Sequence, residues 1–229
     1  MTITTAKLTG IAGLAAIAAG LIFIVIQFIH PPENAATVPT VEWTTVSLLT
    51  ATMATLAIIG ISGLYLRNVQ RMGVLGLIGY VLFATCFILI SAWSFVEIVV
   101  LPPLAEQAPQ FVDDFLAVPG GGDVIGDVGA AKVATGITAL GYLLGGLIFG
   151  IALFRARIVP RWAAVLLAVG SVITILVPVL PHTFERLLAL PMGVALAALG
   201  FSLWRRQREL DTQSKFGLRD AHLDPIGVR

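Results

Sequence analysis

The chain alternates between long apolar runs and short polar segments. Six runs contain almost only hydrophobic and small residues, and they cover about 8–29, 44–66, 72–100, 133–154, 160–180 and 184–204. The hydrocarbon core of a bilayer is about 30 Å thick, so a helix that rises 1.5 Å per residue needs about 20 residues to cross it. Backbone groups in lipid must also bond within their own segment, which uninterrupted runs achieve only as helices. The pattern therefore predicts an all-α polytopic membrane protein, a bundle of six transmembrane helices.

The composition agrees with lipid as the solvent of these runs. Hydrophobic residues make up 58% of the 229 residues and charged residues only 12%, whereas about a quarter of a soluble domain is charged. The first run is longer than the 7 to 15 apolar residues of a signal peptide core. We therefore expect it to remain as a membrane anchor.

Basic residues are distributed unevenly between the two sets of connecting segments. Twelve of the fourteen Lys and Arg residues fall in one set, and only Lys132 and Arg186 fall in the other. Because Lys and Arg stay on the cytoplasmic side during insertion, both termini are predicted to be cytoplasmic in a plasma (inner) membrane protein. The transmembrane domain is predicted to span residues 1–206, and residues 207–229 are predicted to form a disordered cytoplasmic tail.

Arginines recur at the inner ends of the runs and prolines at the outer ends. This recurrence predicts three helical hairpins at about 1–67, 71–156 and 160–206. The alternative, that such residues are common at all helix ends, stays open. The inner junction FRARIVPRWAAVLLAVG, which begins at Phe154, resembles that of multi-pass membrane proteins of actinobacteria. The resemblance implies a bacterial protein with six helices and brings no activity with it.

The segment 101–132 is the longest predicted loop, on the outer side. Within it Phe111, Val112, Phe115 and Leu116 recur at helical spacing. This pattern predicts a short amphipathic helix on the bilayer surface or over the bundle, with Asp113 and Asp114 facing away. The helix is expected to break at Pro119 and the three glycines after it, and the segment before the break acts as a lid or as a static cap.

Ionisable residues are missing from the middle of the predicted helices. Glu97 comes closest, but it lies 24 residues after Gly73, or about 36 Å along a helix, and so belongs to the outer interface. A proton pump or voltage sensor needs charge at depth, a retinal protein needs a central Lys, and a haem protein needs paired His. The sequence argues against all of these, and we assign no cofactor, no catalytic residue and no metal ligand.

Two groups of residues are candidates for ligand binding. His30, Glu97, His182 and Glu185 lie at the outer ends of helices, where they either meet at one metal or acid/base site or only cap helices and contact water. Thr52 and Thr55 share one stripe of the second helix with Thr45 and Ser62. That stripe forms either hydrogen bonds between helices or the polar wall of a substrate path.

The fourth run contains two overlapping GxxxG pairs, Gly141 with Gly145 and Gly146 with Gly150. Glycines at this spacing let two helix backbones approach closely. The sequence leaves open whether the partner is an internal helix or a second copy of the chain. Homo-oligomers and partner membrane proteins therefore both remain expected partners.

No reaction is indicated by these patterns. The leading expectation is a non-enzymatic membrane protein that binds an apolar ligand or a lipid, or that serves as a partner subunit. The alternatives are a membrane enzyme with an outer-face metal or acid/base site, and a facilitator for a neutral solute. The lipid bilayer is an expected partner, and nucleic acid is not, because the basic residues form no single patch.

Overall fold

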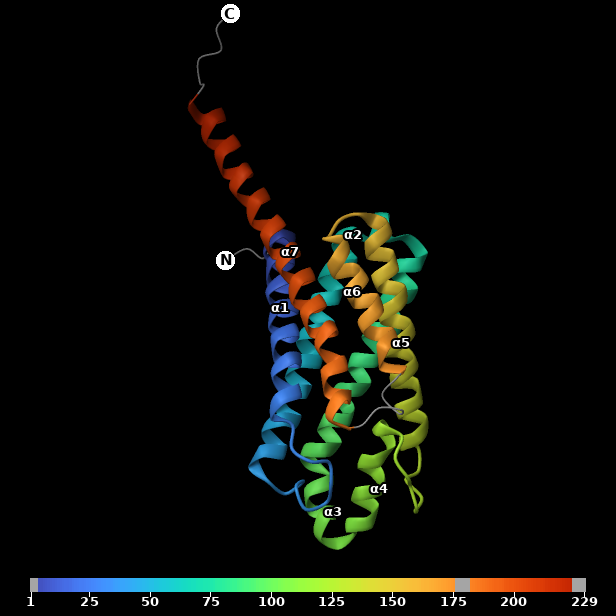
Figure 1. The fold of residues 1–229 in the computed structure, drawn as a ribbon. Helices are drawn as coiled ribbons and strands as arrows, with labels where there is room; N and C mark the ends of the chain where they lie inside the picture. Colours follow the sequence, from blue (N-terminus) through green and yellow to red (C-terminus); the bar gives the residue numbers. More distant parts are fainter. Residues whose placement is uncertain (1–3, 176–181, 224–229) are drawn as a thin grey trace, which may run out of the picture.

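The computed structural model describes the backbone of residues 4–175 and 182–223, and the side chains of these residues except 182–185, 211 and 214–223. The described residues form helices and no strands (Figure 1). In chain order the helices are α1 (Thr5–Ile29), α2 (Val41–Val99), α3 (Leu101–Gln107), α4 (Pro109–Gly120), α5 (Ala131–Ala156), α6 (Arg161–Val172) and α7 (His182–Leu223). The predicted all-helical class is confirmed.

Helix α2 is interrupted by a sharp reversal. Two residues there leave the helical conformation, Asn68 (φ −124°, ψ 15°) and Gly73 (φ 57°, ψ −155°). Only glycine adopts such a positive φ without steric cost, which accounts for the residue at 73. The reversal divides α2 into a first arm, residues 41–67, and a second arm, residues 74–99.

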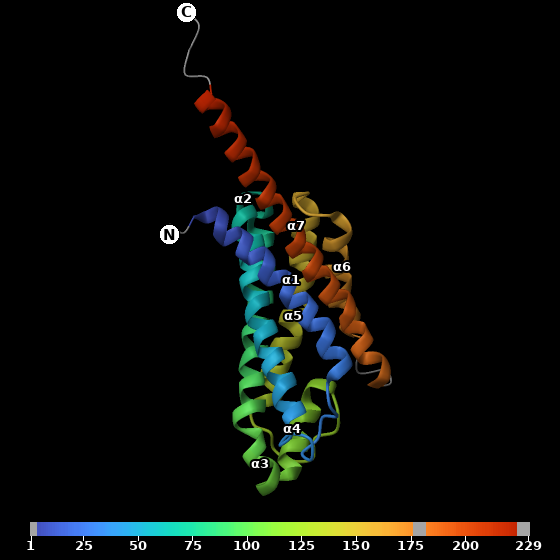
Figure 2. The same cartoon turned by 90° about the vertical axis from the view of Figure 1, so that its left-hand side faces the viewer.

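Contacts between the two arms show that they lie antiparallel. The hydroxyls of Ser62 and Tyr80 are 2.9 Å apart, and the rings of Tyr65 and Tyr80 stack with centroids 4.9 Å apart. The indole Nε1 of Trp43 donates to the carbonyl oxygen of Glu97 at 3.3 Å. In a straight helix these two residues would be about 81 Å apart. The arms therefore form a helical hairpin (Figure 2).

The long helices pack in a closed ring. Helix α1 contacts α7 and α2, α2 contacts α5, α5 contacts α6, and α6 contacts α7. Gly60 of the first arm lies against Ala16 of α1, and Gly79 of the second arm lies against the Phe149 backbone of α5. The first arm thus faces α1, and the second arm faces α5.

The glycine pairs of α5 have internal partners. A Cβ added to Gly145 would lie 2.5 Å from the backbone nitrogen of Phe83 in the second arm. A Cβ added to Gly150 would lie 2.8 Å from the carbonyl oxygen of Ala164 in α6. The two GxxxG frames therefore let α5 approach α2 on one side and α6 on the other, which answers the question that the sequence left open.

Among the residues that the structure describes, four helical segments are long and apolar enough to cross a membrane. They are α1, α2, α5 and the Arg186–Leu210 part of α7, and the segment Arg161–Ile175 is a shorter apolar helix. Large apolar side chains such as Leu8, Ile11 and Leu14 are exposed on the outer surface of the bundle. These features are consistent with an α-helical membrane protein. Residues 176–181, where the fifth predicted run ends, lie outside the described residues.

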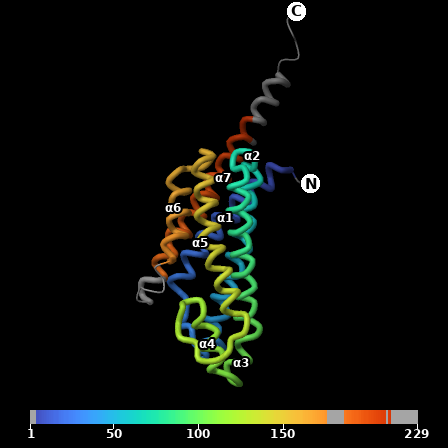
Figure 3. The backbone as a smooth tube through the Cα atoms, turned by 90° about the vertical axis from the view of Figure 1, so that its right-hand side faces the viewer, coloured from blue at the N-terminus to red at the C-terminus, as the bar shows by residue number. Residues whose placement is uncertain are grey.

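The two ends of the bundle differ, and we name them by what they carry. The loop end carries α3 and α4, and the tail end carries the α2 reversal and the α5–α6 connection (Figures 1 and 3). Helix α7 continues past the tail end as a helix to Leu223, through most of the tail predicted to be disordered. An ion pair between Arg205 and Glu209, 2.9 Å long and one helical turn apart, supports the helix there.

Candidate ligand cavity at the loop end

Helices α3 and α4 lie across the loop end (Figure 3), where a small apolar cluster fixes them. Its buried members come from the α1–α2 connection, the first arm, α3 and α4, and they are Ala35, Val38, Trp43, Leu101, Ala105, Val112 and Leu116. The predicted amphipathic helix is confirmed as α4, with Val112 and Leu116 on its buried face. The helix ends at Gly120, followed by Gly121 in the left-handed conformation (φ 71°).

The prediction that Asp113 and Asp114 both face away from the bundle was wrong for Asp114. This side chain is 3% exposed and accepts hydrogen bonds from Gly126 N (2.7 Å), Gln110 Nε2 (2.9 Å) and Ile125 N (3.3 Å). Those donors, the Gly126 amide first, hold the pKa of Asp114 below its usual range. The chain after α4 folds back over the helix, which the helical spacing alone does not show.

Asp113 is exposed, as predicted, but it also has a structural contact. Its carboxylate accepts a 2.7 Å hydrogen bond from the backbone nitrogen of Ala35 in the α1–α2 connection. Together Asp113 and Asp114 fasten α4 to the segments on either side of it. Helix α4 and these two segments form what we name the roof of the loop end.

Beneath the roof lies a cavity of about 440 Å³, within the range of about 300 to 1,000 Å³ usual for small-molecule sites. Its apolar lining comes from α1, the second arm, α4, α5 and α7, and includes Phe23, Leu89, Ile90, Trp93, Leu116, Ala139, Tyr142 and Ala189. Trp93 stacks on Phe115 of α4 with ring centroids 4.3 Å apart. The roof thus contacts the cavity wall directly.

Two hydroxyl groups in the cavity wall have no hydrogen-bond partner. Among the side chains that the structure describes, the Ser94 and Thr135 hydroxyls are the buried polar groups without one, and both residues line this cavity. Ser94 is 1% exposed and belongs to the second arm, whereas Thr135 belongs to α5. A buried polar group without a partner costs free energy, and most such groups in proteins are paired. The two oxygens have almost no accessible surface of their own but belong to residues that line the cavity, which makes them candidate partners for a molecule inside it.

Charged and titratable side chains lie at the rim of the cavity. The Arg186 guanidinium on α7 donates to the Glu33 carboxylate at 3.2 Å, which ties α7 to the α1–α2 connection. His30 Nδ1 lies 2.9 Å from the Pro31 carbonyl oxygen and 3.2 Å from an Arg186 nitrogen. One nitrogen cannot donate to the first and accept from the second. We assign the hydrogen to Nδ1, because a lone pair facing the closer carbonyl oxygen would be repelled, and Nε2 is then an acceptor.

Burial favours the neutral form of the His30 ring. It lowers the pKa of His30 below 6.5, and the nearby Arg186 charge adds to the shift, while the Pro31 hydrogen bond and Glu33 oppose it. The ring also meets Trp43 edge to face at 5.9 Å between centroids. The rim therefore contains the paired charges of Arg186 and Glu33 beside the His30 imidazole.

The structure brings some of the predicted site residues together. His30 and Glu97 both line the cavity, and Glu97 comes from the end of the second arm. The side chains of His182 and Glu185 lie outside the described residues. No group of three His, Cys, Asp or Glu residues suited to a metal ion occurs among the side chains that the structure covers.

The predicted stripe residues Thr52 and Thr55 do not line the loop-end cavity. Thr52 and Thr55 are exposed on the outer surface of the first arm, and the Thr55 hydroxyl donates to the Ala51 carbonyl at 2.9 Å. The threonine of the first arm that lines the cavity is Thr50. Thr50, Ser94 and Thr135 were missed, because no spacing in the sequence distinguishes a hydroxyl facing a cavity from one facing lipid.

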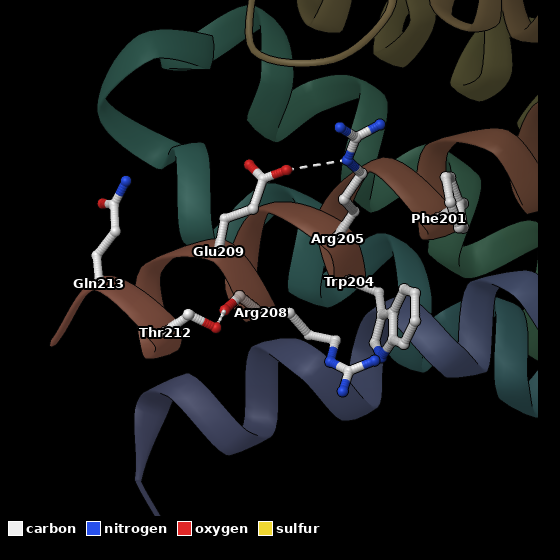
Figure 4. Close-up of a pocket in the computed structure, with 7 residues that line it drawn as sticks. All are labelled: Phe201, Trp204, Arg205, Arg208, Glu209, Thr212 and Gln213. Atoms are coloured by element: carbon white, nitrogen blue, oxygen red, sulfur yellow. Dashed lines mark hydrogen bonds and ion pairs between the residues drawn. The ribbon is translucent and has the colours of Figure 1, made fainter. Parts of the chain in front are cut away.

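A second hollow, of about 560 Å³, lies along α7 at the tail end (Figure 4). Its lining residues are Phe201, Trp204, Arg205, Arg208, Glu209, Thr212 and Gln213, all from this one helix. Arg208 covers the Trp204 ring at 5.0 Å, and Arg205 pairs with Glu209. Because one helix supplies every wall and its charges are already paired, we do not treat this hollow as a site.

Comparison with known proteins adds no template for the function. No family model, no curated protein and no solved structure matches the chain. The function is therefore argued from the loop-end cavity.

Proposed function

We propose that the protein binds a small amphipathic molecule in the loop-end cavity, with an apolar body and one neutral hydrogen-bonding head. The unpartnered hydroxyls of Ser94 and Thr135 carry this proposal, because they sit in an otherwise largely apolar wall. Binding sites of this kind combine apolar surface with a few polar groups that fix orientation. A carbonyl or hydroxyl group of the ligand would satisfy both side chains.

The charges at the rim favour a neutral head. Arg186 is engaged with Glu33 at 3.2 Å, and the described lining contains the carboxyl side chains of Glu33 and Glu97 but no Lys or Arg. An anionic head would meet these carboxyl groups with no cationic partner in the lining, and a buried unpaired charge is costly. Neutral alcohols, ketones and quinone-like rings fit the lining better than fatty acids or phosphate esters do.

The proposal places the protein in the plasma membrane with six spans and both termini in the cytoplasm. The two antiparallel arms of α2 support two of these spans, and the basic residues near the tail end support the orientation. Cysteine labelling tests it, since the only native cysteine, Cys86, is buried. In intact cells an impermeant maleimide should label Asp123→Cys at once and Arg157→Cys only after permeabilisation. The reverse pattern would contradict the orientation.

Ligand binding is tested with 1-naphthol and naphthalene, two fluorescent probes that differ by one hydroxyl. We expect the purified protein to prefer 1-naphthol by up to about tenfold, because one net hydrogen bond contributes about 0.5 to 1.5 kcal/mol. The double variant Ser94→Ala, Thr135→Val should lose this preference while it still binds naphthalene. The matched control is Thr55→Val, which removes an exposed hydroxyl bonded within its own helix.

Two results would remove the proposal. One is equal binding of both probes by the unmodified protein. The other is a preference for 1-naphthol that survives in the Ser94→Ala, Thr135→Val variant. A loss in the Thr55→Val control would instead point to the outer threonine stripe and to the facilitator hypothesis.

A further inference from the structure

A separate groove opens at the tail end of the bundle. It has a volume of about 950 Å³ and is lined by α1, the first arm of α2 with its reversal, Ile158 of the α5–α6 connection, and Arg206 of α7. Unlike the hollow along α7, it is bounded by four segments that lie far apart in the sequence. It also lies at the opposite end of the bundle from the roof.

One wall of the groove is apolar and faces outward. Leu8 of α1 is 54% exposed, and Ile59 and Leu66 of the first arm are 42% and 69% exposed. The floor is closed where α1 and the first arm touch, since a Cβ on Gly63 would collide with the Cβ of Ala12. The wall offers a strip of apolar surface along the side of the bundle, where a membrane protein meets acyl chains.

The other wall is cationic. Arg67, Arg71 and Arg206 line the groove, and no acidic residue does so among the described side chains. Arg206 donates to the Ile158 carbonyl at 3.3 Å, and Arg67 donates to the Gln207 side chain. These contacts hold two guanidinium groups beside the groove.

Other arginines at the tail end interact with groups of their own surroundings. Arg205 pairs with Glu209, and Arg161 and Arg208 lie over the rings of Phe154 and Trp204. Within the described part of the chain no acidic side chain pairs with Arg71 or Arg206. Arg71 and Arg206 therefore present positive charge beside the apolar strip, with no acidic partner among the described side chains.

We infer that this groove binds an anionic phospholipid, with the phosphate at Arg71 and Arg206 and an acyl chain along Leu8, Ile59 and Leu66. Guanidinium groups match the geometry of phosphate oxygens, and basic pockets between membrane helices bind anionic headgroups. The combination of a cationic end and an apolar strip fits an amphiphile rather than a free phosphate ion. This site differs from the loop-end cavity in place, charge and ligand.

The test uses the intact protein in detergent with phosphatidylglycerol and phosphatidylcholine, followed by native mass spectrometry. The unmodified protein should bind phosphatidylglycerol more tightly. The double variant Arg71→Gln, Arg206→Gln should bind it about thirtyfold more weakly, since a basic side chain contributes about 1 kcal/mol at an anionic lipid surface and 1.4 kcal/mol is a factor of ten. The matched control Arg155→Gln, Arg157→Gln removes the same charge from exposed positions outside the groove and should keep the preference.

Three results would overturn the inference, and the first needs no variant. They are equal binding of the two lipids by the unmodified protein, equal losses in the two double variants, and full displacement of the lipid by glycerol phosphate at a concentration similar to that of the lipid. The conservative variant Arg71→Lys, which keeps the charge, should retain most of the preference and so separates charge from folding. The naphthol assay is independent, so failure of this site leaves the proposed function standing, and the reverse also holds.

Discussion

The two ends of the bundle enclose space in different ways. At the loop end α4 and its neighbouring segments cover a cavity of about 440 Å³ whose unpartnered groups are neutral hydroxyls. At the tail end a groove of about 950 Å³ has no such roof, and its polar side carries arginines. One ring of helices therefore supports a cavity with unpartnered hydroxyls at one end and a cationic groove at the other.

The connections between helices account for the difference. At the loop end, residues 30–40 and 100–130 join the long helices, and they are long enough to form their own apolar cluster. At the tail end the chain reverses within 68–73 and 157–160, which leaves no residues to cover the helix ends. Asp113 and Asp114 at the loop end are thus bonded by segments that cover the helix ends, and among the described residues the tail end has no such covering segment.

The largest expected effect comes from a change in the contact between α5 and the second arm. Gly145→Ala would place a Cβ 2.5 Å from the Phe83 backbone nitrogen and push the second arm away from α5. We expect the protein to be destabilised by about 1 to 3 kcal/mol, as for other overpacked interiors. Naphthol binding should be lost, whereas the phosphatidylglycerol preference, which depends on α1, the first arm with its reversal, and Arg206 of α7, should remain. Thermal unfolding in detergent and the two binding assays measure these effects.

Gly136→Ala is the matched control on the same helix. A Cβ there meets nothing within 4 Å, so the change should be neutral or stabilising by up to about 1 kcal/mol, because alanine favours the helix over glycine. Equal stability of the two variants would show that α5 and the second arm do not pack as closely as described. A joint loss of both binding activities in Gly145→Ala would show that the two ends are not independent.

A smaller, local effect is expected from the roof. Asp114→Asn removes the negative charge that accepts the Ile125 and Gly126 amides, and hydrogen bonds to charged acceptors are the stronger ones. We expect these two amides to exchange hydrogen about tenfold faster or more, because the segment after α4 opens locally. Hydrogen exchange measured by mass spectrometry checks this. Asp123→Asn, an exposed change in the same segment, should leave the exchange unaltered. Equal exchange rates in both variants would show that the Asp114 carboxylate does not hold this segment.

The hydrogen bonds that Asp114 accepts also predict how the stability of the roof changes with pH. The pKa of Asp114 is lowered in the folded protein, so its contribution to the roof is complete above the usual carboxyl pKa of about 3.9. The contribution is lost as the pH falls through the lowered value. Protection of the Ile125 amide, corrected for the intrinsic pH dependence of exchange, should therefore persist at pH 5 and decline only in stronger acid.

The sequence predicts the all-helical class and the chain reversal inside α2, because both depend on local composition, but it does not predict that α7 continues to Leu223. Arg67, Arg71 and Gly73 mark the α2 reversal, and His30 and Glu97 sit at run ends, so their place near one end of the bundle could be expected. It is harder to predict which face of a helix points into the bundle. In lipid an apolar side chain is stable on either side of a helix, so hydrophobicity does not say whether Thr52 or Thr50 faces inward.

The site residues that were missed depend on packing between distant segments. Ser94 and Thr135 become notable only because the second arm and α5 leave their hydroxyls without partners. Asp114 is buried only because residues 125–126 fold back over α4. Neither feature can be read from a local pattern of residue types, because each depends on how two distant segments lie relative to each other.

The contact between α1 and α7 has a consequence for how the protein is made. Gly13 and Gly20 of α1 lie against the backbone of α7 at Trp204 and Gly193, although α1 leaves the ribosome well before α7. During synthesis this glycine face has no partner until α7 has been made. The ring closes only then, so a chain that stalls before Gly193 leaves this face of α1 uncovered.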